Sequence, residues 1–329
     1  MMQHKTRLPF LDVLRGIALV AMAIYHFGWD LAFFNYVAPE LVNEGAWKYF
    51  ARSIASSFLI LVGIGLILAH SKGIGWQGFW RRWAKVAGAA LIITIATYFA
   101  TPDAFIFFGI LHQIAFSSLA GLLFLRLPWP ALIILGAVWI GAAPYLRLDA
   151  LTDLHMAWTG LANETVRSND YVPVFPWFGV VLIGMGIGAF LFQRETLFTN
   201  PFAKFSHTWL GRLLAYIGRH SLIFYLIHQP ILIALIYLFS LVMPAQIDPA
   251  RLSADFQSNC QQTCMMQYGE ARCTFYCGCV EADLAAVDLF TPLMNGTIKF
   301  TEEEPLAISQ ACSLDMLAIP QEDDTNDNG

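Results

Sequence analysis

A histidine and an aspartate lie four residues apart near the end of the first apolar segment, at His26 and Asp30. On a helix this spacing puts both side chains on one face, where the carboxylate can fix the imidazole tautomer and stabilise its protonated form. Ionisable side chains are costly in a membrane, and those present commonly have a function. We therefore predict that His26 is a general base oriented by Asp30, although a structural hydrogen bond sealing the helix end requires the same spacing.

Two later apolar segments contain polar side chains of a similar kind. His112 and Gln113 occur in FGILHQIAFSS, and Tyr225 and His228 share one helical face of SLIFYLIHQP. We predict a catalytic role for His112 and substrate-binding roles for Gln113, Tyr225 and His228. Asp170, at the end of the longest loop before the C-terminal region, is a further candidate substrate ligand. Each of these residues has a structural alternative, because polar side chains also join membrane helices by hydrogen bonds.

The histidines of the apolar segments do not follow a metal-binding pattern. The sequence has neither HxxxH nor HExxH spacing, and carboxylates are scarce in these segments. Since a metal site needs several such ligands in suitable geometry, we expect no metal.

The elements that must position these residues are membrane-spanning helices. Hydrophobic residues make up 57% of the chain and charged residues 13%, against roughly 25% charged in soluble domains, and the mean hydropathy is +0.56. We predict an all-α fold, a polytopic transmembrane helix bundle whose first span is retained rather than removed as a signal peptide. About seven spans are expected, at 10–32, 51–70, 83–101, 104–125, 129–146, 173–193 and 220–243.

The positions of Lys and Arg predict how the bundle is oriented. With these spans, 12 Lys and Arg residues fall on one side of the membrane and 4 on the other. Because the positive side is usually cytoplasmic, the N-terminus is expected in the cytoplasm and the C-terminal region outside. The basic, aromatic loop WQGFWRRWAK is expected to anchor to anionic lipid, or alternatively to contribute to a phosphate-rich cosubstrate site.

The C-terminal region is a separate unit. Two prolines interrupt the helical pattern at Pro244–Pro249, so we expect a bundle at 1–245 and a tail at 246–329, with the acidic last residues EDDTNDNG disordered. All six cysteines lie in the tail, which suits an oxidising compartment. Two short antiparallel helices joined near Gly269 would pair Cys260 with Cys277, Cys264 with Cys273 and, by remainder, Cys279 with Cys312. Other connectivities stay open, as does a zinc site on a cytoplasmic tail.

Several segments together resemble a known family. RLPFLDVLRGIALVAMAIYHFGWDL is similar to the first span of polytopic membrane acyltransferases, and FGILHQIA, DYVPVFPWFG and GRHSLIFYLIHQP are similar to later spans. The match is to the bacterial inner-membrane family related to heparan-alpha-glucosaminide N-acetyltransferase, and RLPFLDVLRG and SLIFYLIHQP resemble polysaccharide O-acetylating enzymes more distantly. These motifs cover most of residues 7–243, and the tail lies outside the resemblance to the characterised enzymes.

The resemblance implies an integral inner-membrane acyltransferase. It would move an acetyl or other acyl group from cytoplasmic acetyl-CoA, its cosubstrate, to a sugar or glycan acceptor at the outer face. Arg15 matches the first-span arginine of the family, and His26 matches the first-span histidine of the polysaccharide O-acetylating relatives. The lysosomal enzyme has its key histidine in a lumenal loop, where this chain offers only His155, so the identity of the catalytic histidine stays open.

The phosphates of acetyl-CoA require basic partners, and we expect these to be Arg15 with Arg219, or with Arg81 and Arg82. The expected partners are membrane lipid and the glycan acceptor, with no nucleic acid, and a homodimer is possible. Two other classes of function remain open, a membrane transporter and a non-catalytic assembly or sensor protein. Binding of acetyl-CoA distinguishes the enzyme from both.

Overall fold

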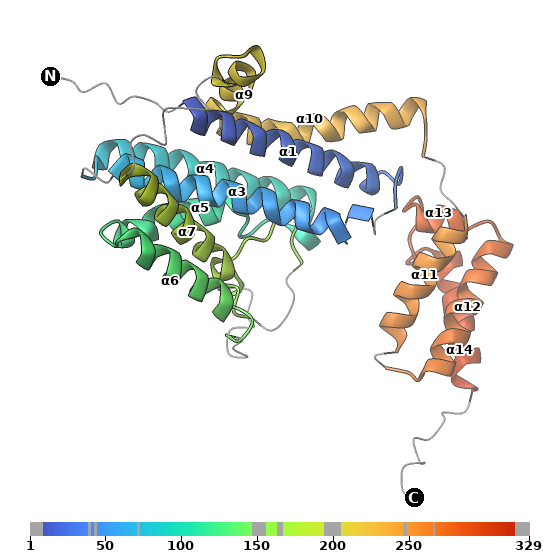
Figure 1. Ribbon diagram of the computed structural model, residues 1–329. Helices are drawn as coiled ribbons and strands as arrows, with labels where there is room; N and C mark the ends of the chain where they lie inside the picture. The colour runs from blue at the N-terminus through green and yellow to red at the C-terminus, as the bar shows by residue number, and fades with distance from the viewer. Residues whose placement is uncertain are drawn as a thin grey trace, which may run out of the picture. The chain divides into compact units, whose positions relative to one another are not determined.

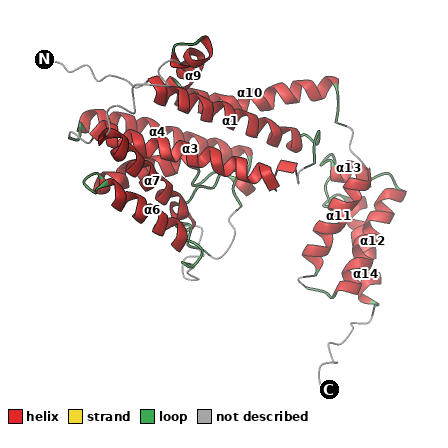
Figure 2. Cartoon of the chain, viewed as in Figure 1, coloured by secondary structure: helices red, strands yellow, loops and turns green. Residues whose placement is uncertain are grey.

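The computed structural model describes residues 9–38, 41–42, 45–70, 73–146, 156–162, 167–193, 205–245, 249–265 and 267–319. Within these residues every regular element is a helix and there is no strand (Figures 1 and 2), which confirms the expected all-α class. His155 and the acidic residues 322–329 lie outside the described residues. The chain divides into two compact units, Met1–Met243 and Pro244–Gly329.

Seven apolar helices of the first unit lie near the seven expected positions. Five are long and apolar enough to cross a membrane: α1 (Pro9–Phe33), α3 (Gly45–His70), α4 (Trp76–Ala100), α7 (Val174–Gln193) and α10 (Ser221–Val242). Two are shorter, α5 (Ile110–Ala120), which continues into the turn η2 (Gly121–Phe124), and α6 (Trp129–Ala142). The protein is therefore a multi-pass membrane protein.

The helices α5 and α6 are shorter than the expected spans 104–125 and 129–146. Prolines and a glycine explain the difference. The residues before α5 form the short turn η1 (Pro102–Ala104) and an irregular stretch, and α5 begins only after Gly109, whose backbone is extended. Helix α6 follows the extended Pro128, and Pro144 comes just after its end. Proline interrupts helical hydrogen bonding and disfavours helical geometry in the residue before it.

The segment WQGFWRRWAK is helical, so its assignment to a loop is wrong. Helix α4 begins at Trp76 and includes the whole segment. Phe79 is buried, whereas Trp80, Arg81 and Arg82 are exposed on the same helical turns. At this end of the helix Phe79 thus faces the protein, whereas tryptophan and arginine side chains face outward together.

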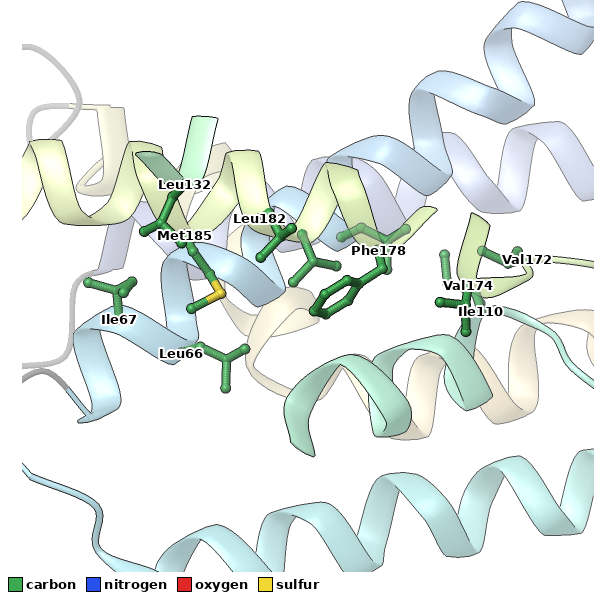
Figure 3. Close-up of a cluster of buried hydrophobic side chains, with 11 residues drawn as sticks. Leu66, Ile67, Ile110, Leu132, Val172, Val174, Phe178, Leu182 and Met185 are labelled. Atoms are coloured by element: carbon green, nitrogen blue, oxygen red, sulfur yellow. The ribbon is translucent and has the colours of Figure 1, made fainter. Parts of the chain in front are cut away.

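The main core of this unit lies where α3, α5, α6 and α7 meet. Its fully buried side chains include Leu132, Leu182 and Met185 (Figure 3), and Leu59 of α3 is fully buried as well. Helices α3 and α7 approach very closely, because a Cβ built on Gly184 would collide with the backbone of Ile60. Small residues of this kind let membrane helices pack backbone against backbone.

A further helix, α9 (Trp209–Arg219), precedes α10 and was not predicted from the sequence. Its exposed face contains Trp209, Leu213 and Tyr216, and its buried face contains Gly211, Ala215 and Gly218. The Thr208 side chain caps the helix by accepting a hydrogen bond from the Gly211 N–H at 3.1 Å. This cap and the helical period of the apolar residues are the signals from which the helix could have been found.

The second unit is a small helical domain built from α11 (Pro249–Cys264), α12 (Glu270–Ala286), α13 (Phe290–Met294) and α14 (Glu303–Leu317). Disulfides join Cys260 to Cys277, Cys264 to Cys273 and Cys279 to Cys312. These are the pairs that the hairpin argument predicts, and Gly269 does stand at the start of α12. Because all six cysteines are bonded, none is a thiolate ligand for the alternative zinc site.

Candidate functional site

Two histidines that are far apart in the sequence, His26 and His228, meet at the interface of α1 and α10. These helices run side by side (Figure 1). The ring centroids of His26 and His228 are 5.1 Å apart, with the rings at 63° in an edge-to-face arrangement. His26 is partly buried and His228 is buried. The interface therefore brings together the residues predicted as the base and as a substrate ligand.

The tautomer of His228 is fixed by the backbone. Its Nδ1 atom lies 2.7 Å from the carbonyl oxygen of Tyr225. A carbonyl only accepts hydrogen bonds, so Nδ1 must donate, and in the neutral ring Nε2 then holds the lone pair. Nε2 is buried and has no hydrogen-bond partner among the residues that the structure describes. His228 thus presents an unused acceptor within the membrane part of the protein.

Asp30 does not pair with His26, contrary to the prediction. Its side chain is fully buried, and its Oδ1 atom accepts a hydrogen bond from Gln229 Nε2 at 2.6 Å. No described residue forms a hydrogen bond with Oδ2. The i, i+4 spacing puts Asp30 and His26 on the same face, but each side chain meets a different residue of α10. Gln229 was missed in the sequence, although an amide directly after His228 in an apolar span was a usable signal.

His112 holds the start of α5. Its Nδ1 atom accepts from the Gly109 N–H at 3.2 Å, and its Nε2 atom lies 3.1 Å from Thr94 Oγ1. The Thr94 hydroxyl donates to the carbonyl of Ile106 at 2.7 Å, so its oxygen is free to accept from Nε2–H. Both ring nitrogens are occupied, and the geometry favours a structural role for His112 over the catalytic role predicted.

Asp170 fastens the loop before α7 to two helices. Its Oδ2 atom accepts from the Ile110 N–H at 2.8 Å, at the start of α5, and from the Tyr225 hydroxyl at 3.3 Å. Burial raises the pKa of the Asp170 carboxyl, and the two hydrogen bonds act in the opposite direction. Gly109 leaves the space in which this carboxylate sits, because a Cβ there would collide with it. Asp170 and Tyr225 are thus joined to each other rather than left open for a ligand.

Gln113 is fully buried within α5. Its Nε2 atom donates to Ser117 Oγ at 3.1 Å, and its Oε1 atom has no partner within the described part of the chain. Nothing in the described contacts joins it to the histidine pair, so its predicted substrate-binding role gains no geometric support.

A cavity of about 270 Å³ lies at the end of the bundle where α1 begins. Its lining comes from α1, α4, α9 and α10 and consists of Leu11, Asp12, Arg15, Arg82, Gly218, Arg219 and Ser221. It therefore unites three of the four arginines that the sequence analysis selected, while the adjacent Arg81 is not part of the lining. Arginines from three elements around one cavity suit an anion such as a phosphate ester.

Helix α9 reaches this cavity because two glycines let it lie directly on α1. A Cβ on Gly218 would collide with the backbone carbonyl of Asp12, and one on Gly16 would collide with that of Leu214. Close contact at these two points fixes the end of α9. Arg219 follows Gly218 immediately, so the same packing places its side chain at the cavity.

Comparison with known proteins gives one family match. Residues 7–230 match the family model described as heparan-alpha-glucosaminide N-acetyltransferase, catalytic. This region includes the histidine pair and the arginine-lined cavity. No curated protein and no solved structure gave a significant match.

Proposed function

Because the chain belongs to the heparan-alpha-glucosaminide N-acetyltransferase catalytic family, a family of membrane acetyltransferases, we propose that it transfers an acetyl group from acetyl-CoA to a sugar or glycan acceptor. The observation that carries the proposal is the arrangement of two centres on one helix. Arg15 at the cavity and His26 at the histidine pair are both on α1. At 1.5 Å per residue they are separated by roughly 16 Å along the helix axis.

The cavity suits the phosphates of the donor. Arg15, Arg82 and Arg219 provide positive charge from three different elements, and Ser221 is the first residue of α10. The start of a helix bears partial positive charge and free N–H groups, both of which favour an anion. With its phosphates held there, acetyl-CoA would extend its thioester arm along α1 toward His26.

The histidine pair suits the transfer step. The acceptor amine or hydroxyl attacks the thioester carbonyl carbon, His26 takes the proton of the attacking group, and the C–S bond breaks to leave a thiolate that is protonated to the thiol. We assign the base to His26 because its ring is partly exposed, whereas that of His228 is buried. When His26 becomes an imidazolium, the free Nε2 of His228 beside it can accept the second N–H, which is the role expected of Asp30.

We also propose on which side of the membrane the donor and the acceptor bind. The bias of Lys and Arg supports a cytoplasmic position for the arginine-lined cavity, on the side where acetyl-CoA is available, in a bacterial-type inner membrane. The disulfides of the tail suit the opposite, oxidising side. The acceptor would then be modified at the extracytoplasmic face.

The test is acetyl transfer in proteoliposomes. Radiolabelled acetyl-CoA is supplied to the face bearing the cavity, and a panel of sugars with free amines or only hydroxyls is supplied to the other. His26→Ala should lower transfer by about 10²–10⁴-fold, whereas His207→Ala, which removes an exposed histidine elsewhere in the unit, should not. Well-folded protein that neither binds acetyl-CoA nor labels any acceptor would refute the proposal and favour a transporter.

A further inference from the structure

The arginine-lined cavity contains one acidic side chain among its described lining residues, that of Asp12. Asp12 Oδ1 lies 3.0 Å from Arg15 Nη1, one turn along α1, and both side chains are partly buried. An i, i+3 ion pair of this kind contributes only about 0.2–0.5 kcal/mol to helix stability. Its contribution to folding is too small to account for an acidic group in a site suited to anions.

Asp12 cannot easily move away from the cavity. Gly218 of α9 lies directly on its backbone carbonyl, so the main chain at this position is held between two helices. The side chain has one hydrogen-bond partner among the described residues, Arg15. Arg82 and Arg219 have no carboxylate partner of their own in the described residues. A carboxylate therefore remains in the lining of the cavity whether or not an anion is present.

We propose that Asp12 is an internal competitor of the phosphate groups for Arg15 and thereby limits how tightly the cavity holds its ligand. This inference rests on the proposed function, in which the ligand is coenzyme A and its acetyl ester. An arriving phosphate must share Arg15 with a carboxylate and must bear the repulsion of a like charge close by. The pair re-forms when the anion leaves.

In the proposed function, a carboxylate that weakens anion binding favours release of the product. Acetyl-CoA and the product coenzyme A have the same phosphates, so affinity in the cavity binds donor and product equally. Uniform binding of this kind lowers KM without speeding the chemical step, and it retards release of the product. A fixed carboxylate beside Arg15 weakens both complexes and keeps product release fast.

The experiment compares wild type with Asp12→Asn, which keeps the shape of the side chain and its carbonyl acceptor but removes the charge. Asp103→Asn is the matched control, because Asp103 is an exposed acid in η1 outside the cavity. Dissociation constants are measured in detergent for coenzyme A, acetyl-CoA and tripolyphosphate at several salt concentrations. Steady-state turnover gives product inhibition in parallel.

Asp12→Asn should bind all three anions about tenfold more tightly at low salt, as expected for loss of one like charge a few ångströms away, with less gain at high salt. Product inhibition by coenzyme A should strengthen in proportion, and Asp103→Asn should match wild type. In an Arg15→Gln background the effect of Asp12→Asn should be smaller, because the competition for Arg15 is gone and only the direct repulsion of the phosphates remains.

Equal or weaker anion binding by Asp12→Asn overturns the inference and makes Asp12 a residue that merely positions Arg15. The proposed function fails separately. If wild type binds tripolyphosphate but not acetyl-CoA, the donor is wrong, while the comparison of Asp12→Asn with wild type for tripolyphosphate still decides the role of Asp12. Absence of anion binding in both proteins overturns both proposals.

Discussion

Replacing Gly218 with alanine should separate α9 from α1 and disrupt the arginine-lined cavity. The added Cβ would lie within 3.0 Å of several backbone atoms of α1, the closest being the Asp12 carbonyl oxygen, a spacing that real Cβ atoms essentially never show. Backbone atoms cannot rotate away as a flexible side chain can, so the two helices must move apart. Overpacking of this type costs about 1–3 kcal/mol of folding free energy.

The same displacement should affect binding more than folding. Arg219 is adjacent to Gly218, and a shift of about 1 Å in a positioning group can cost about a hundredfold in function. We therefore expect Gly218→Ala to remain folded but to bind acetyl-CoA at least tenfold more weakly, roughly the equivalent of 1.4 kcal/mol. The assays are denaturant unfolding and acetyl-CoA binding, both in detergent.

Gly88→Ala is the matched control for this prediction. Gly88 is also within a helix, α4, but a Cβ there would meet no atom within 4 Å. Removing a glycine from a helix interior without a collision should stabilise the protein by about 0.5–1 kcal/mol and leave binding unchanged. If Gly218→Ala behaves like Gly88→Ala in both assays, the packing of α9 on α1 does not position Arg219 as described.

Four further predictions concern the loop attachment, the two buried carboxylates and the tail. Gly109→Ala should destabilise the protein because its Cβ collides with the Asp170 carboxylate, and Asp170→Asn in the same background should recover little, since the side chain keeps its size. Burial raises the pKa of the Asp170 carboxyl in the folded protein. Burying this group therefore costs no folding free energy below the ordinary carboxyl pKa, where it is protonated in both states, and the full cost applies above the raised pKa, where it is ionised in both. Wild type should therefore gain unfolding free energy relative to Asp170→Asn as the pH falls through this range, and a pH-independent difference would contradict the assignment. Asp30→Asn should retain most acetyl transfer, because Asp30 forms a hydrogen bond with Gln229 rather than with His26. A loss of transfer as large as that of His26→Ala would instead support the predicted pairing of Asp30 with His26. In the tail, removing the Cys279–Cys312 disulfide, which closes a separation of 33 residues, should cost about 1 kcal/mol more than removing Cys264–Cys273, which closes 9, as measured by unfolding of the oxidised full chain.

The sequence predicted features that depend on local spacing. The cysteine pairs followed from i, i+4 positions on two short helices, and the apolar helices followed from long hydrophobic runs. Helix periodicity also predicted which face holds His26 and Asp30. It could not show which residue of α10 each would meet, and so it missed Gln229.

The choice between adjacent residues also depended on packing. Arg81 and Arg82 differ by about 100° around α4, and only the arrangement of α1, α4 and α9 decides that Arg82 lines the cavity. The role of His112 depended on Thr94 and on the irregular stretch before α5, neither of which periodicity reveals. Local pattern thus identified the chemical groups, whereas contacts between helices determined their partners.

The most direct test of the central claim measures acetyl-CoA affinity and single-turnover acetyl transfer in the same preparations of His26→Ala and Arg15→Gln. In the proposed mechanism, phosphate binding and proton transfer occur at two separate centres on α1. His26→Ala should therefore keep the wild-type dissociation constant and lose transfer, whereas Arg15→Gln should lose affinity and still transfer at saturating acetyl-CoA. Unchanged transfer in His26→Ala, or unchanged affinity in Arg15→Gln, would contradict the account.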